Sequence, residues 1–394
     1  DPRVDFTPGA KQYPAYRDYS NDLSFDSQTS GGLQAKTTLD PQTSVTAQLY
    51  AEGYGSEYAA KLKWLFVTYT PTYNSTFRVG KIGSPFYYYS DFLNVGYAYH
   101  WISPPDTVYP FDTTITGVDY TYQDVGEHFD WSVEVLAGSS DEYYSSIQSQ
   151  VTNHNSIGVV FNASNASGVS FRAMLYQTDS AMHADVLSPE SLDANVNSAV
   201  DILLDRLNLP ENIATAVRPS LVTATQAHLG TDWTGADSTP IRYAELALRS
   251  EWGRWMVMGE CIGARNNNYL FNQATSAYLT AGVKVDRALF HITYSTANAV
   301  LNERAKEDLA MAVPTLGATP DEAGAYLASQ IRSGYALLSG TKADFETIGV
   351  RYDVSTKTAL KLDLTRVVEY ASRPSETAGI GSNLLLRAAI NATF

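Results

Sequence analysis

The sequence predicts an all-β fold: a closed antiparallel transmembrane β-barrel of about sixteen strands, with short helices in long extracellular loops. Three observations support this prediction. Apolar and polar residues alternate through most of the chain, short and long connections follow one another between the alternating segments, and the last segment ends on an aromatic residue, Phe394. We expect residues 1–394 to form a single barrel domain.

The alternation is clearest in residues 384–394, where Leu384 and Ile390 share one face and Arg387 and Asn391 the other. Successive side chains of a β-strand point to opposite faces, so one face suits hydrocarbon and the other suits water. The same pattern recurs in residues 45–52, 61–66, 77–79, 131–137, 171–176, 245–249, 279–284, 290–295, 347–353 and 360–365. On the lipid-facing side we expect Leu62, Trp64, Val350, Leu362 and Ile390.

The charged face of these strands must point inward, because a Lys or Arg facing lipid costs about 2–4 kcal/mol at the bilayer midplane. Eight strands fill their own interior, whereas about sixteen enclose a water-filled channel. About fifteen strands can be placed from Gly31 onward. Both chain ends should lie on the periplasmic side, so we expect one more strand within residues 3–20.

Connections of two lengths separate the strands. Short turns are expected at residues 40–43, 71–74, 163–166, 251–254 and 354–356, and long loops near 83–113, 139–155, 178–239, 298–343 and 369–381. Short periplasmic turns and long outer loops are typical of outer-membrane barrels. Ser188-Pro189 and Thr319-Pro320 are helix start signals, so 178–239 and 298–343 should be helix-containing extracellular loops. We expect these helices to pack within the loops rather than on the membrane.

Composition excludes several classes of protein. The net charge of -15 argues against nucleic-acid binding. The single cysteine, Cys261, allows no intramolecular disulfide, and no uninterrupted apolar run of about 18 residues predicts a membrane-spanning helix. The 27 Tyr residues suit a membrane–water interface, although a secreted β-sandwich is an alternative explanation. If the protein is exported, Asp1 lies at or beyond a processing site.

Enzymatic chemistry finds no support in the sequence. The six His residues lack metal-ligand spacing, and we find neither a phosphate-binding loop nor a Ser or Cys nucleophile motif. We therefore expect no catalytic residue, no metal and no cofactor.

Residues 83–113 are the densest functional candidate, because a wholly solvated loop would not normally carry so many aromatic rings. We interpret the segment as a constriction loop folded into the barrel, with packing at the rim or at a subunit contact as the alternative. Its candidate site residues are Tyr87, Tyr88, Tyr89, Asp91, Tyr97, Tyr99, His100, Trp101 and Asp106.

Inward-facing basic residues fall on the first and last strands, which are neighbours in a closed barrel. They are Lys61, Lys63, Arg78, Arg351, Lys361 and Arg387. We expect them to form one positive arc opposite Asp91, Asp106 or Asp112, and charges around a pore set its ion selectivity. The throat should then favour anionic or zwitterionic solutes. Alternatively, these basic residues pair with Glu52, Asp353 and Asp363.

The alternating strands, the terminal Phe, the loop rhythm and the long loop 83–113 together resemble the trimeric sixteen-stranded porins of Gram-negative outer membranes, over nearly the whole chain. Tyr97-Ala98-Tyr99-His100-Trp101-Ile102-Ser103-Pro104-Pro105 also looks like a Pro-Pro stretch of gammaproteobacterial porin-like proteins. The sequence departs from enterobacterial general porins in lacking their acidic Pro-Glu-Phe-Gly-Gly signature and in its long helical insertions.

The resemblance implies a passive diffusion channel for ions and small polar solutes in the bacterial outer membrane. It also implies a homotrimer in contact with membrane lipid and lipopolysaccharide, and we expect the subunit contact near Leu49, Trp64 and the N-terminal segment. Two alternatives remain: a substrate-selective channel with a Tyr-rich binding loop, and a structural or adhesive barrel that binds a partner through its outer loops.

Overall fold

The computed structural model describes residues 29–54, 57–109, 114–144, 149–184, 187–230, 234, 238–266, 273–300, 303–315, 317–339, 342–370 and 379–393. Within these ranges a 15-stranded antiparallel sheet has its strands in the order of the sequence. The strands are β1 (Ser30–Asp40), β2 (Thr43–Tyr54), β3 (Glu57–Thr72), β4 (Ser75–Gly83), β5 (Thr114–Val125), β6 (Asp130–Tyr144), β7 (Ser149–Ser164), β8 (Val169–Ala184), β9 (Thr239–Trp252), β10 (Trp255–Asn266), β11 (Gln273–Val285), β12 (Ala288–Val300), β13 (Lys342–Ser355), β14 (Thr358–Tyr370) and β15 (Gly379–Ala392).

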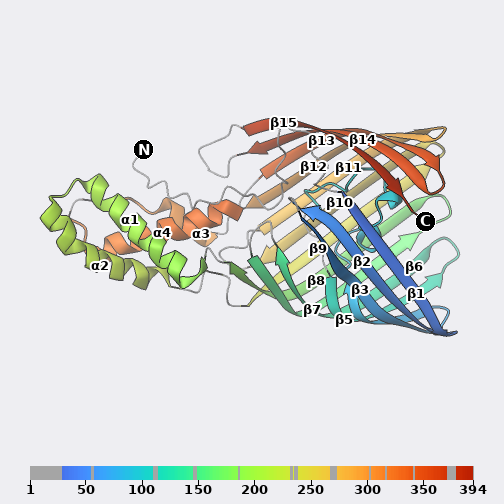
Figure 1. Cartoon of the computed structure of the whole chain (residues 1–394), viewed down its shortest axis with the longest axis horizontal. Coiled ribbons are helices and arrows are strands. Elements are labelled where there is room, and N and C mark those ends of the chain that lie inside the picture. The colour runs from blue at the N-terminus through green and yellow to red at the C-terminus, as the bar shows by residue number, and fades with distance from the viewer. Residues whose placement is uncertain are drawn as a thin grey trace.

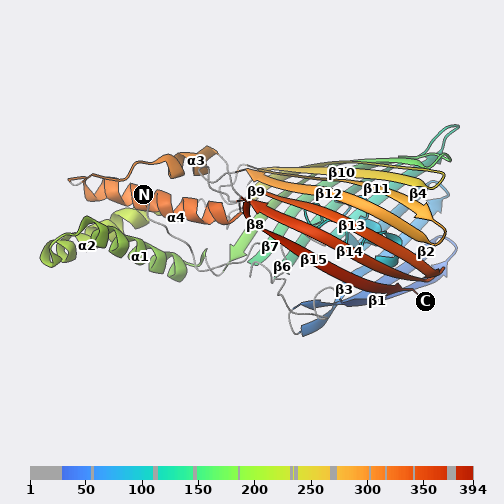
Figure 2. The ribbon, with the colours of Figure 1, turned by 90° about the horizontal axis from the view of Figure 1, so that it is seen from above.

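The sheet rolls around an interior space, here called the lumen (Figures 1 and 2). Strands β1 and β15 both run from the end with the long connections to the end with the short turns. They are therefore parallel to each other, and antiparallel closure needs one further strand between them. The strand predicted within residues 3–20 lies outside the described residues and remains a prediction.

Polar side chains shape the short turns at one end of the barrel. The carboxylate of Asp40 accepts the backbone N–H groups of Gln42 at 2.8 Å and Thr43 at 2.9 Å. In the turn between β7 and β8, the Asn165 side chain accepts the N–H of Val169 at 3.0 Å. Asp and Asn favour such turns because a side-chain oxygen replaces a backbone acceptor. These local bonds explain why the short turns could be predicted from sequence.

The two faces of the sheet differ as the alternation predicts. On β12, Phe290 and Ile292 are 49% and 58% exposed on the outer face, whereas His291 is 3% exposed on the lumen side. Leu62, Leu362 and Ile390 are also exposed on the outer face, and Val350 pairs with Leu362 on that face. An apolar exterior that surrounds polar side chains is the arrangement a bilayer requires.

The expectation that Trp64 faces lipid was wrong. A register shift lies between Gln48 and Leu49: Gln48 pairs with Trp64, and Leu49 pairs with Leu62. Lys63 is therefore the extra residue of a β-bulge, and an extra residue reverses which side chains point inward. Beyond the bulge, Trp64 and Phe66 turn to the lumen with ring centroids 6.5 Å apart, and Leu65 takes the outer face.

The long loop expected near 139–155 is also corrected, because most of it is strand. β6 continues to Tyr144 and β7 begins at Ser149. Side chains bridge the two strands: the Asn153 amide donates to Ser140 Oγ at 2.9 Å, and the Gln150 amide donates to Asp141 at 2.8 Å. These cross-strand bonds extend the hairpin with polar residues, which carry no apolar alternation to signal a strand.

Two long connections contain helices. The β8–β9 connection contains α1 (Pro189–Leu207) and α2 (Glu211–Leu229), and the β12–β13 connection contains α3 (Glu303–Ala310) and α4 (Pro320–Ser339). Ser188 Oγ caps α1 by accepting the Ser191 N–H, and Pro210 separates α1 from α2. The described helices include none that is both long enough and apolar enough to cross a membrane.

The four helices pack into one bundle around α4, although they come from two loops far apart in the sequence. Tyr326, Leu327 and Ile331 of α4 are almost completely buried in its core, which also takes side chains from the other three helices. Figures 1 and 2 show the bundle beyond the long-connection end of the barrel. The helices of the bundle therefore form no part of the lumen wall, which consists of strands.

Candidate functional site: the lumen and its inserted loop

The described part of the connection between β4 and β5 lies inside the barrel (Figures 1 and 2). Residues 84–109 of this connection, here called the inserted loop, are described, and Asp112 lies outside the described residues. Two short 3-10 turns shape it, η1 (Ser90–Phe92) and η2 (Gly96–Ala98). Side chains of this loop contact lumen-facing residues from β8 to β15.

Most aromatic residues of the inserted loop are buried against the wall. Tyr87, Tyr89, Tyr99, Trp101 and Tyr109 form one cluster with Met258 of β10 and Tyr278 of β11. The rings of Trp101 and Tyr278 meet edge to face, with centroids 5.3 Å apart. Aromatic pairs of this kind add about 0.5–1.5 kcal/mol to the stabilisation from burial. The rings therefore hold the loop to the wall rather than lining an open throat.

A first polar anchor fixes the start and end of the inserted loop to β8–β10. Arg172 donates to the Pro85 carbonyl at 2.7 Å, and the Glu260 carboxylate accepts the Tyr88 N–H at 3.1 Å. Glu260 also accepts the hydroxyl groups of Tyr109 and Tyr278. Glu260 is only 3% exposed. Charged hydrogen bonds within such a buried site are stronger than those in water.

A second polar anchor fixes the middle of the loop to β12–β14. Trp101 Nε1 donates to Thr293 Oγ1 at 2.8 Å, and the Ile102 N–H donates to Asp363 at 2.9 Å. Lys361 Nζ donates to the carbonyl oxygens of Gly96 and Trp101. The Lys361 side chain is thereby removed from the open lumen, with only 3% of its surface exposed.

Two arginines extend this second anchor. Arg351 donates to the Tyr97 carbonyl at 2.8 Å and to the Tyr99 carbonyl at 3.0 Å, and its guanidinium lies 4.5 Å from the Tyr97 ring centroid. Arg387 of β15 donates to Ser103 Oγ at 2.8 Å. Backbone carbonyls of the loop thus accept from Arg351 and Lys361, and a loop hydroxyl accepts from Arg387.

The predicted positive arc is therefore divided. Arg351, Lys361 and Arg387 bind the inserted loop, and two of them also approach carboxylates, with Arg351–Asp353 at 2.8 Å and Arg387–Asp363 at 4.0 Å. The alternative, in which basic residues pair with Asp353 and Asp363, is thus found for Arg351 and Arg387. The side chain of Glu52 lies outside the description.

The other three basic residues lie on β3 and β4, and none of them belongs to the second anchor. Arg78 forms ion pairs with Asp119 at 2.7 Å and Glu134 at 3.1 Å. By register Lys61 points inward, and Lys63 Nζ lies 5.8 Å from the Tyr50 ring centroid. The charges on this side are therefore mixed rather than uniformly positive.

The exposed side of the inserted loop faces this mixed wall. Phe92 is 53% exposed, and Asp91 interacts electrostatically with Arg78, Asp119 and Glu134. Asn94 reaches β2, where its amide approaches Gln48 Oε1 at 3.4 Å. Of the loop residues singled out in the sequence, Asp91 is the one most clearly placed at the open lumen. Tyr88 and Tyr97 are half-buried, and His100 is buried beside Trp101 and His291.

Sequence reasoning missed Glu260, Arg172, Asp119 and Glu134, and also Glu245, which pairs with Arg172 at 3.4 Å. Glu260 shares the inward face of β10 with Met256 and Met258, so the alternation on that strand is weak. Met258 can face inward because Tyr89 of the inserted loop covers it, and this contact cannot be read from the strand alone. The signal that could have identified Glu260 is that it is a single acidic residue among apolar residues on the inward face of β10.

The sequence matches no protein-family model and no curated protein. Its fold is similar to solved outer-membrane proteins at low identity. An anion-selective porin from Comamonas acidovorans is 12% identical, with 94% of this chain and 91% of that chain covered and a TM-score of 0.49. Salmonella typhi OmpF is 10% identical, with 95% and 93% covered and a TM-score of 0.49. Pseudomonas putida OprB is 9% identical, with 93% and 87% covered and a TM-score of 0.48.

The fold of this chain can be described from its own geometry. Its sheet is rolled, antiparallel and ordered as in the sequence, with an apolar outer face and a polar lumen. A loop from the β4–β5 connection enters that lumen and is bonded to its wall. An apolar exterior around a polar interior that a loop narrows is the arrangement of outer-membrane β-barrels, and the fold of this chain is porin-like.

Proposed function

We propose that the chain is a passive diffusion channel for ions and small polar solutes. The observation that supports this most directly is the position of the inserted loop, whose hydrogen bonds to the wall, as described above, go to β8–β15 except for one from Asn94 to β2. Its exposed residues Asp91 and Phe92 face the wall that carries Arg78. A solute path between the loop and this wall would stay open without a change in loop position.

The charges along this path favour weak ion selectivity with a transverse field. Arg78 is balanced by Asp119 and Glu134, while Lys61 and Lys63 add positive charge and Asp91 adds negative charge from the loop. Charges around a pore set its selectivity, and distant loop charges are screened within about 8 Å at physiological ionic strength. The throat should therefore matter more than the overall charge of -15. Zwitterionic solutes gain most from a field across the path.

Assembly as a homotrimer is part of this proposal, because closed cyclic symmetry lets one apolar patch of each barrel contact the next. The patch we expect is the outer face of β2 and β3 near Leu49 and Leu65, both about half exposed. Leu65 replaces Trp64 in this expectation because of the bulge at Lys63. If native mass spectrometry in mild detergent showed only the mass of a monomer, the proposed trimer would be contradicted.

Contact with lipopolysaccharide is also proposed, at the long-connection end of the barrel. There, Arg242 donates to Gln177 at 3.1 Å, and Arg366 pairs with Glu346 at 3.3 Å, all on the outer face. Charged side chains on the outer face are tolerated near the membrane interface, where their cost falls to about 0–1 kcal/mol.

Planar-bilayer recording of the full-length protein tests the channel proposal. We expect large, voltage-independent conductance steps in KCl that increase in proportion to salt concentration. The absence of conductance steps from folded, inserted protein would refute the proposal and favour a structural barrel.

A further inference from the structure

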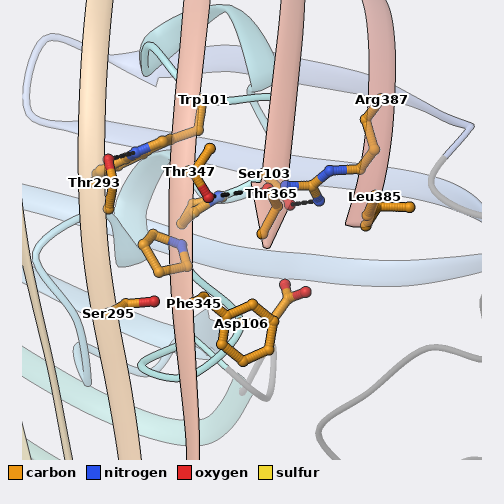
Figure 3. A pocket seen from close by; sticks show the side chains of 12 residues that line it. Trp101, Ser103, Asp106, Thr293, Ser295, Phe345, Thr347, Thr365, Leu385 and Arg387 are labelled. Carbon is orange, nitrogen blue, oxygen red and sulfur yellow. Dashed lines mark hydrogen bonds between the residues drawn. The ribbon is translucent and has the colours of Figure 1, made fainter. Parts of the chain in front are cut away.

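A pocket lies between the inserted loop and the wall formed by β12–β15 (Figure 3), and Arg78 is not among the residues that line it. The loop contributes Trp101, Ser103 and Asp106, and two prolines close one side. The wall contributes Thr293, Ser295, Phe345, Thr347, Thr365, Leu385 and Arg387. By strand direction, these wall residues lie nearer the long-connection end than Lys361 and Arg351. A solute entering from that end would meet the pocket before passing the loop.

The pocket brings one positive and one negative group together around hydroxyl groups. The Arg387 guanidinium is held by Ser103 Oγ at 2.8 Å, and Asp106 lies on the loop side of the same space (Figure 3). Thr347 and Thr365 share one hydrogen bond at 2.9 Å, which leaves hydroxyl lone pairs to accept another. Phe345 and Leu385 add a small apolar area.

The lining is rigid, which favours binding over transient contact. Trp101 is 2% exposed, and its indole N–H is bonded to Thr293 at 2.8 Å. The next residue, Ile102, is bonded through its N–H to Asp363. Groups held in place before a ligand arrives lose little entropy when it binds.

We propose that this pocket binds the smallest zwitterions of the α-amino acid class, such as glycine. The ligand carboxylate would accept from Arg387, and its ammonium group would donate to Asp106 and to a threonine hydroxyl. A simple anion would meet the carboxylate of Asp106, and a simple cation would meet the guanidinium of Arg387. The inference rests on the proposed channel function, because the pocket would hold solute beside the diffusion path.

Single-channel recording with glycine as the probe tests the pocket. In the wild-type protein we expect added glycine to reduce the KCl current in a saturable way, while the neutral analogue glycolamide does not. Arg387→Gln should raise the half-saturating glycine concentration about tenfold, the effect expected when a charged hydrogen bond is lost. Asp106→Asn should raise it in the same direction.

A second pair of variants protects the test against altered loop position. Ser295→Leu fills the pocket from β12 without removing a bond to the loop, so it should abolish the glycine effect. Ser180→Leu makes the same change at a buried lumen-side serine of β8, away from the pocket, and should leave the glycine effect unchanged.

The outcomes separate the pocket from the channel. If neither the wild-type protein nor any variant conducts KCl, the channel proposal fails. If KCl conductance is normal but glycine has no saturable effect, or the effect survives Ser295→Leu and Arg387→Gln, the pocket proposal is overturned. Should Arg387→Gln fail to fold, as judged by loss of the compact barrel band on unheated gels, Ser295→Leu decides the question alone.

Discussion

His291 Nε2 and Asp363 Oδ1 lie 3.4 Å apart although a whole strand separates them. The intervening position on β13 is Gly349, which pairs with His291 on one side and with Asp363 on the other. A Cβ at position 349 would collide with both side chains. The absence of a side chain there lets Asp363 sit where its second oxygen accepts the Ile102 N–H of the inserted loop. The absence of a side chain at Gly349 therefore positions the Asp363 carboxylate that binds the inserted loop.

Gly349→Ala should destabilise the barrel by about 1–3 kcal/mol, because the added methyl group forces His291 or Asp363 out of position. The temperature at which the folded barrel band disappears from unheated gels should fall. Gly263→Ala is the matched control, because its nearest neighbour would lie at 3.9 Å. Equal stability of the two variants would show that the contact above Gly349 is not tight.

Lys361→Met should make the open-channel current noisier. The substitution leaves the carbonyl oxygens of Gly96 and Trp101 without their charged donor, and each such bond contributes about 1.5–3 kcal/mol. The segment between these residues should then leave the wall and enter the lumen intermittently. Lys61→Met removes a lumen lysine that makes no contact with the described part of the loop, and its noise should match that of the wild type. Quiet current in Lys361→Met would argue that the aromatic cluster alone holds the loop.

Substitutions on opposite sides of the path should shift ion selectivity in opposite directions. Lys61→Gln with Lys63→Gln removes positive charge from β3 and should increase cation preference, whereas Asp91→Asn removes negative charge from the loop and should increase anion preference. Reversal potentials in a KCl gradient measure both shifts. Arg366→Gln, on the outer face, is the control and should change nothing. Shifts of the same sign would mean that these residues do not face a common path.

Arg332→Ala should loosen the helical bundle while leaving conduction intact. Arg332 of α4 pairs with Asp308 of α3 at 2.8 Å and donates to the His228 carbonyl near the end of α2 at 2.7 Å. Both charged side chains are mostly buried, so the substitution removes two charged hydrogen bonds from the buried carboxylate of Asp308. Limited proteolysis should cut the bundle faster than in the wild type. Lys306→Ala, which removes an exposed pair with Glu303, should have little effect.

Conductance of the Arg332→Ala channel should equal that of the wild type, because the bundle lies beyond the strands that form the lumen wall (Figure 2). A large change in conductance would instead show that the bundle controls access to the lumen.

The sequence by itself determined the barrel, its two faces and the positions of its short turns. Strand periodicity and turn chemistry are local properties, so residues such as Phe290, His291 and Asp40 report them directly. The same local pattern located the aromatic residues of the inserted loop and the start signals of α1 and α4.

Only the tertiary structure decided what those residues contact. The bulge at Lys63 depends on the pairing of β2 with β3, and it turned Trp64 into the lumen. Arg351, Lys361 and Arg387 share the inward parity that predicted a positive pore wall, but the inserted loop brings backbone carbonyls to the first two and the Ser103 hydroxyl to the third. The helices of two distant loops form one core for the same reason: burial depends on which surfaces meet in space, and strand or helix periodicity records only which side of an element a residue occupies.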